Sequence, residues 1–417
     1  MAAVFRSGRV AARAAPQADA RSGGGALVAS LRPRVLMVTG AYWPELSGGG
    51  LQCRTLMAAL RDHCQFEVLT TCVDPRLPVE DDVEGVRVHR VHVDVARPAS
   101  TVKAALAMTT CFWRVSPRID IVHLHGFSRK SILIALLSRL LGKRVVITMH
   151  TAGQDDPEGV RRLGRVAYWT YRHADRIVAI SPMMAEHYRA ALPADRLAVV
   201  PNGLDTDRFR PATVTERADL RRECGAPLDL PWILFVGFFS RDKRPQLLYE
   251  AWTALRERHG VTTALVCVGV TDSPYFEVDA SLASEMRADA HARGVEHLLR
   301  FTGEVKDVER YYRAADVFVM PSIREAFGMA LIEAMSSGVP VIATRIPGVT
   351  DDIVSDGRTG LLVPPDNAVA LTSALQTLLS GPTAAMRTEA RNSVVARYGL
   401  PVFGDRWASI YHELVRP

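Results

Sequence analysis

The sequence predicts an α/β protein built from two doubly wound, parallel-sheet domains. Short apolar segments of strand length alternate with helical stretches over nearly the whole chain, which is the pattern of βαβ units. The chain has 417 residues, a length that fits two domains. A turn signal, Pro201-Asn202-Gly203-Leu204-Asp205, divides the alternating pattern into two halves. Each half is therefore expected to form one Rossmann-like domain.

Strands are expected wherever a short apolar run lies between turn-forming residues. In the first half these runs are residues 35–39, 66–70, 86–91, 121–124, 145–148, 176–180 and 198–200, and in the second half 233–236, 264–268, 299–302, 317–320, 341–344 and 361–363. The segments between them are long enough for helices, so consecutive strands should run parallel. Ligands of such sheets bind at the carboxyl ends of the strands, where functional residues are therefore expected.

The two ends of the chain are expected to differ from the two domains, which we place at residues 34–200 and 201–400. Residues 1–33 are rich in Ala, Arg, Gly and Ser and contain a single acid, Asp19. This composition favours a disordered basic extension, although a transit-type targeting peptide shares it. Residues 401–417 are expected to form a helix, because their apolar residues have helical spacing. A family resemblance, described below, implies that this helix packs against the first domain.

Composition describes an ordinary globular protein. Hydrophobic residues make up 48% and charged residues 23% of the chain, and no apolar run reaches the ~18 residues that span a bilayer. The net charge of +6 favours an anionic partner, but no zinc finger or RNA-binding motif is present, so nucleic acid is not expected. The six cysteines are scattered without metal-ligand spacing, which indicates reduced cysteines in a cytoplasmic protein without a structural metal.

The most informative stretch runs from Pro321 to Thr344 and places two glutamates, Glu325 and Glu333, around a helix start. Gly338 and Pro340 end this helix, because Gly adopts the left-handed cap and Pro cannot continue a helix. Glu325 then lies in the loop before the helix, and Glu333 lies about one turn inside it. Free backbone amides at a helix N-terminus attract phosphates, and carboxylates bind hydroxyl groups. The pattern therefore fits a sugar nucleotide.

This stretch resembles the donor site of the retaining glycosyltransferases of family four, which have the GT-B fold. The resemblance rests on Pro-Ser-x4-Phe-Gly-x4-Glu-Ala-Met-x2-Gly-x-Pro-Val-Ile-Ala and extends over nearly the whole chain from about Arg34. It implies two Rossmann-like domains facing an interdomain cleft, a nucleoside-diphosphate sugar as donor, and no cofactor. It assigns a catalytic role to Glu325 and donor contacts to Phe327, Gly328, Met329, Ala330 and Glu333.

Two features of the first half match the same family. A glycine-rich loop follows the first strand and precedes a helix, and the resemblance assigns donor contacts to Gly48 and Gly49. His150 follows another apolar strand, and the resemblance places it against the donor sugar as a catalytic residue. His123 and His125 share one face of a strand. We expect one of them to pack in the core and the other to line the cleft, without a metal.

A second phosphate contact is expected after the first strand of the second half. The family carries an Arg and a Lys there, which neutralise the diphosphate. Lys243 matches the Lys, but Phe238 occupies the position of the Arg. Arg241 is close in sequence and is the candidate to replace that Arg. Cations at a helix start are unfavourable unless an anion is present, which supports donor contacts for Lys243 and Arg241.

Other charged segments admit two interpretations. Residues 101–118 and 129–144 are apolar with basic ends. They fit crossover helices better than helices on an anionic membrane, but a peripheral membrane contact stays open. Asp351 and Asp352 resemble a metal pair, yet they fit the first turn of a helix, where acids are favourable.

The activity that the resemblance implies is metal-independent sugar transfer with retention of configuration. The acceptor, whether glycan, lipid carrier or small molecule, is not specified by the sequence. One alternative is another GT-B enzyme, such as an epimerase or a phosphorylase. The other is a non-catalytic sugar-nucleotide-binding or assembly protein, and Phe238 in place of Arg is its main support.

Overall fold

The computed structural model describes residues 32–45, 48–94, 97–150, 156–273 and 277–416. The chain divides into two units, Met1–Arg32 and Pro33–Pro417, and the description below concerns the second unit. The expected basic extension covers residues 1–33, of which residues 1–31 lie outside the described residues, so that expectation stays a prediction.

The first half of the chain forms an eight-stranded sheet in the order β3-β4-β2-β1-β5-β6-β7-β8. Its strands are β1 (Arg34–Thr39), β2 (Gln65–Cys72), β3 (Glu80–Val83), β4 (Val86–His92), β5 (Ile121–His125), β6 (Arg144–Met149), β7 (Arg176–Ala179) and β8 (Leu197–Val199). Neighbours are parallel except β3 and β4, which are antiparallel. The expected strands are confirmed, and β3 is an addition to them.

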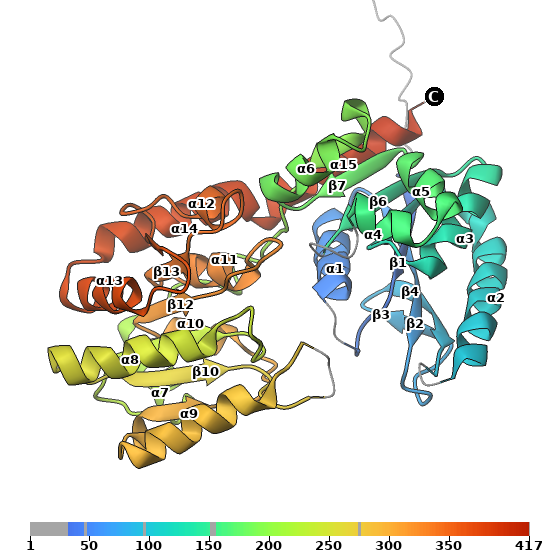
Figure 1. The fold of residues 1–417 in the computed structure, drawn as a ribbon. Helices are drawn as coiled ribbons and strands as arrows, with labels where there is room; N and C mark the ends of the chain where they lie inside the picture. Colours follow the sequence, from blue (N-terminus) through green and yellow to red (C-terminus); the bar gives the residue numbers. More distant parts are fainter. Residues whose placement is uncertain (1–31, 46–47, 95–96, 151–155, 274–276, 417) are drawn as a thin grey trace, which may run out of the picture. The chain divides into compact units, whose positions relative to one another are not determined.

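The second half forms a six-stranded sheet in the order β11-β10-β9-β12-β13-β14, with all neighbours parallel. Its strands are β9 (Trp232–Val236), β10 (Ala264–Val268), β11 (Leu299–Phe301), β12 (Val317–Met320), β13 (Val341–Thr344) and β14 (Leu361–Val363). Counted within this half, the order is 3-2-1-4-5-6, that of the Rossmann fold. The predicted fold class, with two doubly wound parallel sheets, is confirmed (Figure 1).

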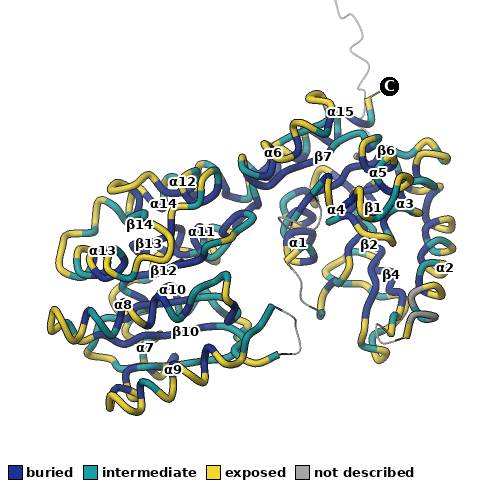
Figure 2. Tube along the Cα trace, in the orientation of Figure 1, coloured by how far each residue is buried: buried dark blue, intermediate teal, exposed yellow. Residues whose placement is uncertain are grey.

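Helices connect the strands and cover both sheets. They are α1 (Gly48–Leu60), α2 (Pro98–Val115), α3 (Arg129–Leu140), α4 (Pro157–Arg162), α5 (Arg165–Arg172), α6 (Pro182–Arg189), α7 (Val214–Cys224), α8 (Pro245–His259), α9 (Ala280–Ala292), α10 (Glu309–Ala314), α11 (Met329–Ser336), α12 (Thr350–Ile353), α13 (Ala368–Ser380), α14 (Ala384–Tyr398) and α15 (Leu400–Val415). Short 3-10 turns are η1 (Ser116–Arg118), η2 (Ala194–Arg196) and η3 (Glu296–Leu298). In Figure 2 the central strands are buried while the outer helix faces are exposed.

Three helices test what the sequence led us to expect of its charged segments. Helices α2 and α3 join β4, β5 and β6, so both basic-ended segments are crossover helices, as expected. Asp351 and Asp352 lie in the first turn of α12, which confirms the helix-start interpretation of this pair.

The last helix, α15, packs against elements of the first sheet. A Cβ on Gly404 would lie 3.1 Å from the carbonyl oxygen of Ala59 in α1. Tyr411 Oη lies 2.6 Å from Nδ1 of His123 in β5. The buried side chains of α15 include Phe403, Trp407, Ile410, Tyr411 and Leu414. This helix therefore supports the strand ends that carry the histidines of the first half.

All six cysteines are free, and five of them are buried while Cys111 is half-buried. No helix among the residues that the structure describes combines the length and the apolar character needed to cross a bilayer.

Candidate active site

Three histidines gather at the carboxyl ends of β5 and β6. His123 and His125 alternate along β5 with their ring centroids 4.3 Å apart, and His150 follows β6. Nδ1 of His125 lies 3.0 Å from Nε2 of His150, and these two rings stack with centroids 5.3 Å apart. We call these residues the histidine cluster. His123 is the packed member, since its two nitrogens meet Tyr411 Oη and Thr148 Oγ1.

The histidine cluster is uncharged at neutral pH. Burial lowers the pKa of His150 to about 4, and it lowers the pKa of His123 and of His125 well below the usual 6.5, helped by neighbouring imidazoles. Nε2 of His125 is buried and has no hydrogen-bond partner among the described residues. Such an orphaned polar atom at a strand end can serve a ligand.

The glycine-rich segment differs from the expected loop. Helix α1 already begins at Gly48, so Gly48 and Gly49 form its first turn, and the expectation that these glycines lie in a loop before the helix is wrong. A Cβ on Gly49 would lie 3.5 Å from Cδ2 of His150. The first turn of α1 therefore lies directly against the histidine that the sequence singled out.

The predicted loop and helix start of the second half are present. Helix α11 begins at Met329 after Gly328, whose φ of 107° is left-handed and suits glycine. Gly338 also has a positive φ, 71°, and ends the helix as expected. Phe327 is buried and packs edge-on against Tyr398, so its side chain belongs to the core. Among the predicted donor residues here, Met329 and Ala330 are half-buried in the first turn of α11.

Lys243 and Glu325 meet directly. Nζ of Lys243 donates to Oε1 of Glu325 over 2.6 Å, and their side chains are 23% and 11% exposed. Nζ of Lys243 also lies 5.7 Å from the ring centroid of Phe238, the residue at the family's Arg position. We call Lys243 and Glu325 the lysine–glutamate pair. The sequence predicted both residues for one site but did not predict this contact.

Glu333 is held inside the protein. Tyr312 Oη donates to Oε2 of Glu333 over 2.9 Å. Burial raises the pKa of Glu333 to about 7, partly opposed by the Tyr312 hydrogen bond and the charge of Arg208. This carboxyl group therefore changes charge near neutral pH, unlike an ordinary glutamate.

Arg241 does not join the lysine–glutamate pair in this structure. Its side chain is 80% exposed, and its Nε donates to Oδ2 of Asp279 over 2.9 Å. Both residues line a cavity of about 410 Å³. Arg241 is thus close in sequence to Lys243, but its guanidinium is paired with the carboxylate of Asp279.

Sequence reasoning missed Gln52, one turn into α1. Its side chain is 5% exposed, its Nε2 donates to Sδ of Met329 over 3.3 Å, and its Oε1 has no partner among the described residues. This contact links the glycine turn of α1 to the first residue of α11. A polar residue on the buried face of an amphipathic helix was the only available signal.

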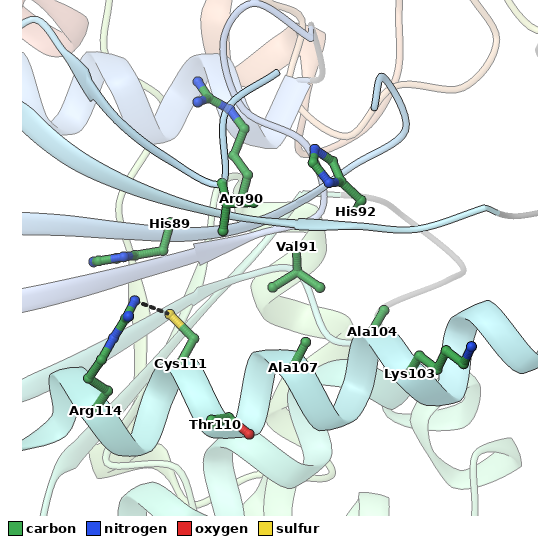
Figure 3. Close-up of a pocket in the computed structure, with 11 residues that line it drawn as sticks. His89, Arg90, Val91, His92, Lys103, Ala104, Ala107, Thr110, Cys111 and Arg114 are labelled. Atoms are coloured by element: carbon green, nitrogen blue, oxygen red, sulfur yellow. Dashed lines mark hydrogen bonds between the residues drawn. The ribbon is translucent and has the colours of Figure 1, made fainter. Parts of the chain in front are cut away.

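Another cavity, of about 480 Å³, contains none of the predicted site residues. It lies between β4 and α2, with Val91 of β4 facing Ala104 and Ala107 of α2, and Cys111 and Arg114 at one end (Figure 3). Arg90, although it borders the cavity, points to the other side of β4 (Figure 3). Within the described residues, no three His, Cys, Asp or Glu side chains are grouped to hold a metal ion.

Comparison with known proteins shows which family of proteins the chain resembles. The family model described as "Glycosyl transferase 4-like domain" matches residues 47–203, and the one described as "Glycosyl transferases group 1" matches residues 230–381. The chain is 31% identical to the alpha-maltose-1-phosphate synthase of Mycolicibacterium smegmatis over 79% of this chain and 84% of that protein. It is also 31% identical to a D-inositol 3-phosphate glycosyltransferase of Arthrobacter over 81% and 83% of the two chains.

Solved structures share the fold at lower identity. Sucrose-phosphate synthase from Thermosynechococcus elongatus has a TM-score of 0.74 at 22% identity, covering 92% of this chain and 99% of that one. HepE of Anabaena, solved with UDP and glucose, has a TM-score of 0.72 at 18% identity, covering 90% and 98%. The two sheets, the matched domains and these relatives agree: the chain belongs to the group 1 glycosyltransferases of family four and is a glycosyltransferase with the GT-B fold.

Proposed function

We propose that the protein is a retaining glycosyltransferase that moves a sugar from a nucleoside-diphosphate sugar to a hydroxyl group of an acceptor. The observation that carries this proposal is the lysine–glutamate pair beside the start of α11. It combines a cation, a carboxylate and free helix amides, and these groups suit a diphosphate and a sugar respectively.

Each group then has a defined part in binding the donor. Lys243 and the amides of residues 328–330 bind the diphosphate, while Glu325 accepts hydrogen bonds from sugar hydroxyls. Glu333 accepts hydrogen bonds from the ribose, which favour its ionised form and lower its raised pKa. The UDP and glucose in the solved HepE structure support a donor of this class for the shared fold.

The proposed reaction is a front-face displacement without a protein nucleophile. The bond between the anomeric carbon and the diphosphate oxygen breaks, and the acceptor oxygen bonds to the same face. The acceptor proton passes to the departing diphosphate. Lys243 and the helix amides stabilise the negative charge that develops on the leaving group. His150, kept neutral by burial, lies beside the anomeric centre. The proposal requires neither a metal nor a cofactor.

For the acceptor we propose a phosphorylated sugar or polyol. The two relatives described above are named for a sugar phosphate and an inositol phosphate. The net charge of +6 also favours an anionic substrate. A glycan or a lipid carrier has no comparable support.

The free, mostly buried cysteines support a cytoplasmic location.

A peripheral contact with an anionic membrane has one supporting feature, the exposed Val102, Leu106 and Trp113 on α2. Sedimentation with vesicles containing phosphatidylglycerol tests this contact. Equal recovery of wild type and Leu106→Ser in the soluble fraction contradicts it.

The decisive experiment is a thermal-unfolding screen against UDP-, GDP- and ADP-sugars, followed by assays of the donor that binds. A ligand at 100 times its Kd adds about 2.7 kcal/mol of stability. We expect one donor class to stabilise the protein and to release nucleoside diphosphate when an acceptor is added, with an α-linked product from an α-linked donor. Epimerised sugar as the product favours the epimerase alternative, and binding without turnover favours the non-catalytic alternative.

A further inference from the structure

A lysine of the first half has no part in donor binding. Lys130 stands in the first turn of α3, directly after β5. Its Nζ donates to Oγ1 of Thr71 over 2.8 Å, and the same hydroxyl donates to the carbonyl oxygen of Gly40 over 2.6 Å. Thr71 lies near the end of β2 and Gly40 follows β1 directly. The ammonium group therefore lies at the carboxyl ends of two strands, the edge at which parallel sheets bind ligands.

The charge of Lys130 is not compensated within the described part of the chain. No described carboxylate lies within ion-pair distance of its Nζ, and its hydrogen-bond partner is the neutral hydroxyl of Thr71. The side chain is half-buried, and the loss of water lowers the pKa of Lys130. A cation is also unfavourable in the first turn of a helix, because the helix dipole is positive there.

A purely structural role explains the hydrogen bond but not the charge. A neutral donor in the place of Nζ would make the same bond to Thr71 Oγ1 without the cost of a desolvated ammonium. The unfavourable charge therefore requires a further reason, and an anion that binds there removes both penalties. An ammonium has three N–H donors, of which Thr71 takes one, so two remain for the oxygens of an anion.

We propose that Lys130 binds the phosphate group of the acceptor. This inference rests on the proposed function, because it names the residue of the first domain that recognises a phosphorylated sugar or polyol. The donor diphosphate is assigned to Lys243 and α11 in the other half, so Lys130 is available for a second phosphate. The phosphate then lies beside Gly40, at the same edge of the first sheet as His150, which the first turn of α1 contacts.

The test compares charged and uncharged probes on wild type and two lysine variants. The probes are D-inositol 3-phosphate, glucose 1-phosphate and inorganic phosphate, with myo-inositol and glucose as uncharged controls. The variants are Lys130→Met and Lys103→Met, the second an exposed lysine on α2. We expect at least one phosphate ester to stabilise wild type and Lys103→Met, and we expect Lys130→Met to bind it at least tenfold more weakly. Inorganic phosphate binding more tightly than both esters overturns the acceptor assignment.

The stability of the free variant separates binding from folding. Without ligand, Lys130→Met should unfold at the same temperature as wild type or higher, because it removes a desolvated cation. A folded Lys130→Met that binds the ester within twofold of wild type overturns the proposal. So does a wild type that none of the three phosphate probes stabilises.

Donor assays distinguish this failure from failure of the proposed function. If Lys130→Met hydrolyses the donor at the wild-type rate but ester binding does not depend on Lys130, the acceptor site is wrong and the glycosyltransferase proposal stands. If the ester binds through Lys130 and no nucleotide sugar binds or reacts, the phosphate site stands and the proposed donor chemistry is wrong.

Discussion

The carboxyl ends of the two sheets carry opposite kinds of chemistry. At the first sheet, the histidine cluster is buried and neutral, since burial lowers the pKa of all three imidazoles. At the second sheet, Nζ of Lys243 and Oε1 of Glu325 form an ion pair over 2.6 Å, and burial raises the pKa of Glu333 to about 7. The same physical effect, loss of water around an ionisable group, disfavours the cation in one half and the anion in the other.

This difference indicates how the two halves divide the proposed reaction. Charged groups lie where a diphosphate with its sugar would bind, because they stabilise charge that develops on departure. In the proposed reaction the neutral imidazole of His150 lies beside the anomeric centre, so it adds no positive charge next to the oxocarbenium-like carbon. The two halves should therefore respond differently to substitution and to pH.

The largest effect is expected for the lysine–glutamate pair. Lys243→Ala and Glu325→Ala should each lower turnover by roughly 10²–10³-fold, the usual loss for one electrostatic contact to a transition state. The measurement is the steady-state rate with the identified donor and acceptor. Lys306→Ala, an exposed lysine in the same half, is the control and should keep the wild-type rate. Near-normal rates in either purified, folded variant contradict the donor assignment.

The second effect is acid destabilisation through the histidine cluster. An unfolded histidine has a pKa near 6.5, whereas that of His150 in the folded protein is about 4. The unfolded chain binds more protons in this interval, so the free energy of unfolding falls as pH drops from 7 to 4, by roughly 3 kcal/mol for this residue. Urea unfolding at several pH values should show a shallower fall in His150→Asn. His297→Asn, at an exposed position, should follow wild type, and equal slopes in all three proteins argue against a buried neutral His150.

Glu333 should make the free energy of unfolding depend on pH in the opposite direction. Its pKa in the folded protein is about 7, against an ordinary value of 4.5, so the folded state binds more protons between these values. The free energy of unfolding then decreases as pH rises, by roughly 2 kcal/mol between pH 5.5 and 7.5. Glu333→Gln retains an acceptor for Tyr312 and should lose this dependence. If wild type and Glu333→Gln show the same curve, Glu333 titrates as an ordinary exposed glutamate.

The same contrast explains how much the sequence could predict. The second half was easier to predict from the sequence, because strong motifs specify the loop at Glu325, the start of the helix and its cap at Gly338. Strand positions were predictable in both halves, since a parallel strand buried on both faces is a continuous apolar run. What the sequence could not supply were contacts between distant residues, such as Lys243 with Glu325 and Gln52 with Met329.

The strand β3 shows why a local pattern fails. Its residues Glu80–Val83 carry three acids and no apolar alternation, so no periodicity marks a strand. It exists because it pairs with β4 and because Asp81 lies 2.7 Å from the buried guanidinium of Arg90. Similarly, the glycines at 48–50 suggested a loop, since helix propensity disfavours Gly, but the structure continues α1 through them.

The smallest expected effect concerns Arg241 and sharpens the donor side of the comparison. Its ion pair with Asp279 is largely exposed, so Arg241→Ala should change the free energy of unfolding by less than about 1 kcal/mol. If Arg241 replaces the family's missing arginine, it must leave Asp279 when the diphosphate binds, and Arg241→Ala should raise the donor Kd roughly tenfold. Asp279→Asn frees the guanidinium and should tighten donor binding, while Arg256→Ala, an exposed arginine of α8, should not change it. If the donor Kd of Arg241→Ala is unchanged, Arg241 does not replace the family's arginine. Lys243 is then the cation that binds the diphosphate, and Phe238 at the family's Arg position means that this chain has one positive charge fewer there.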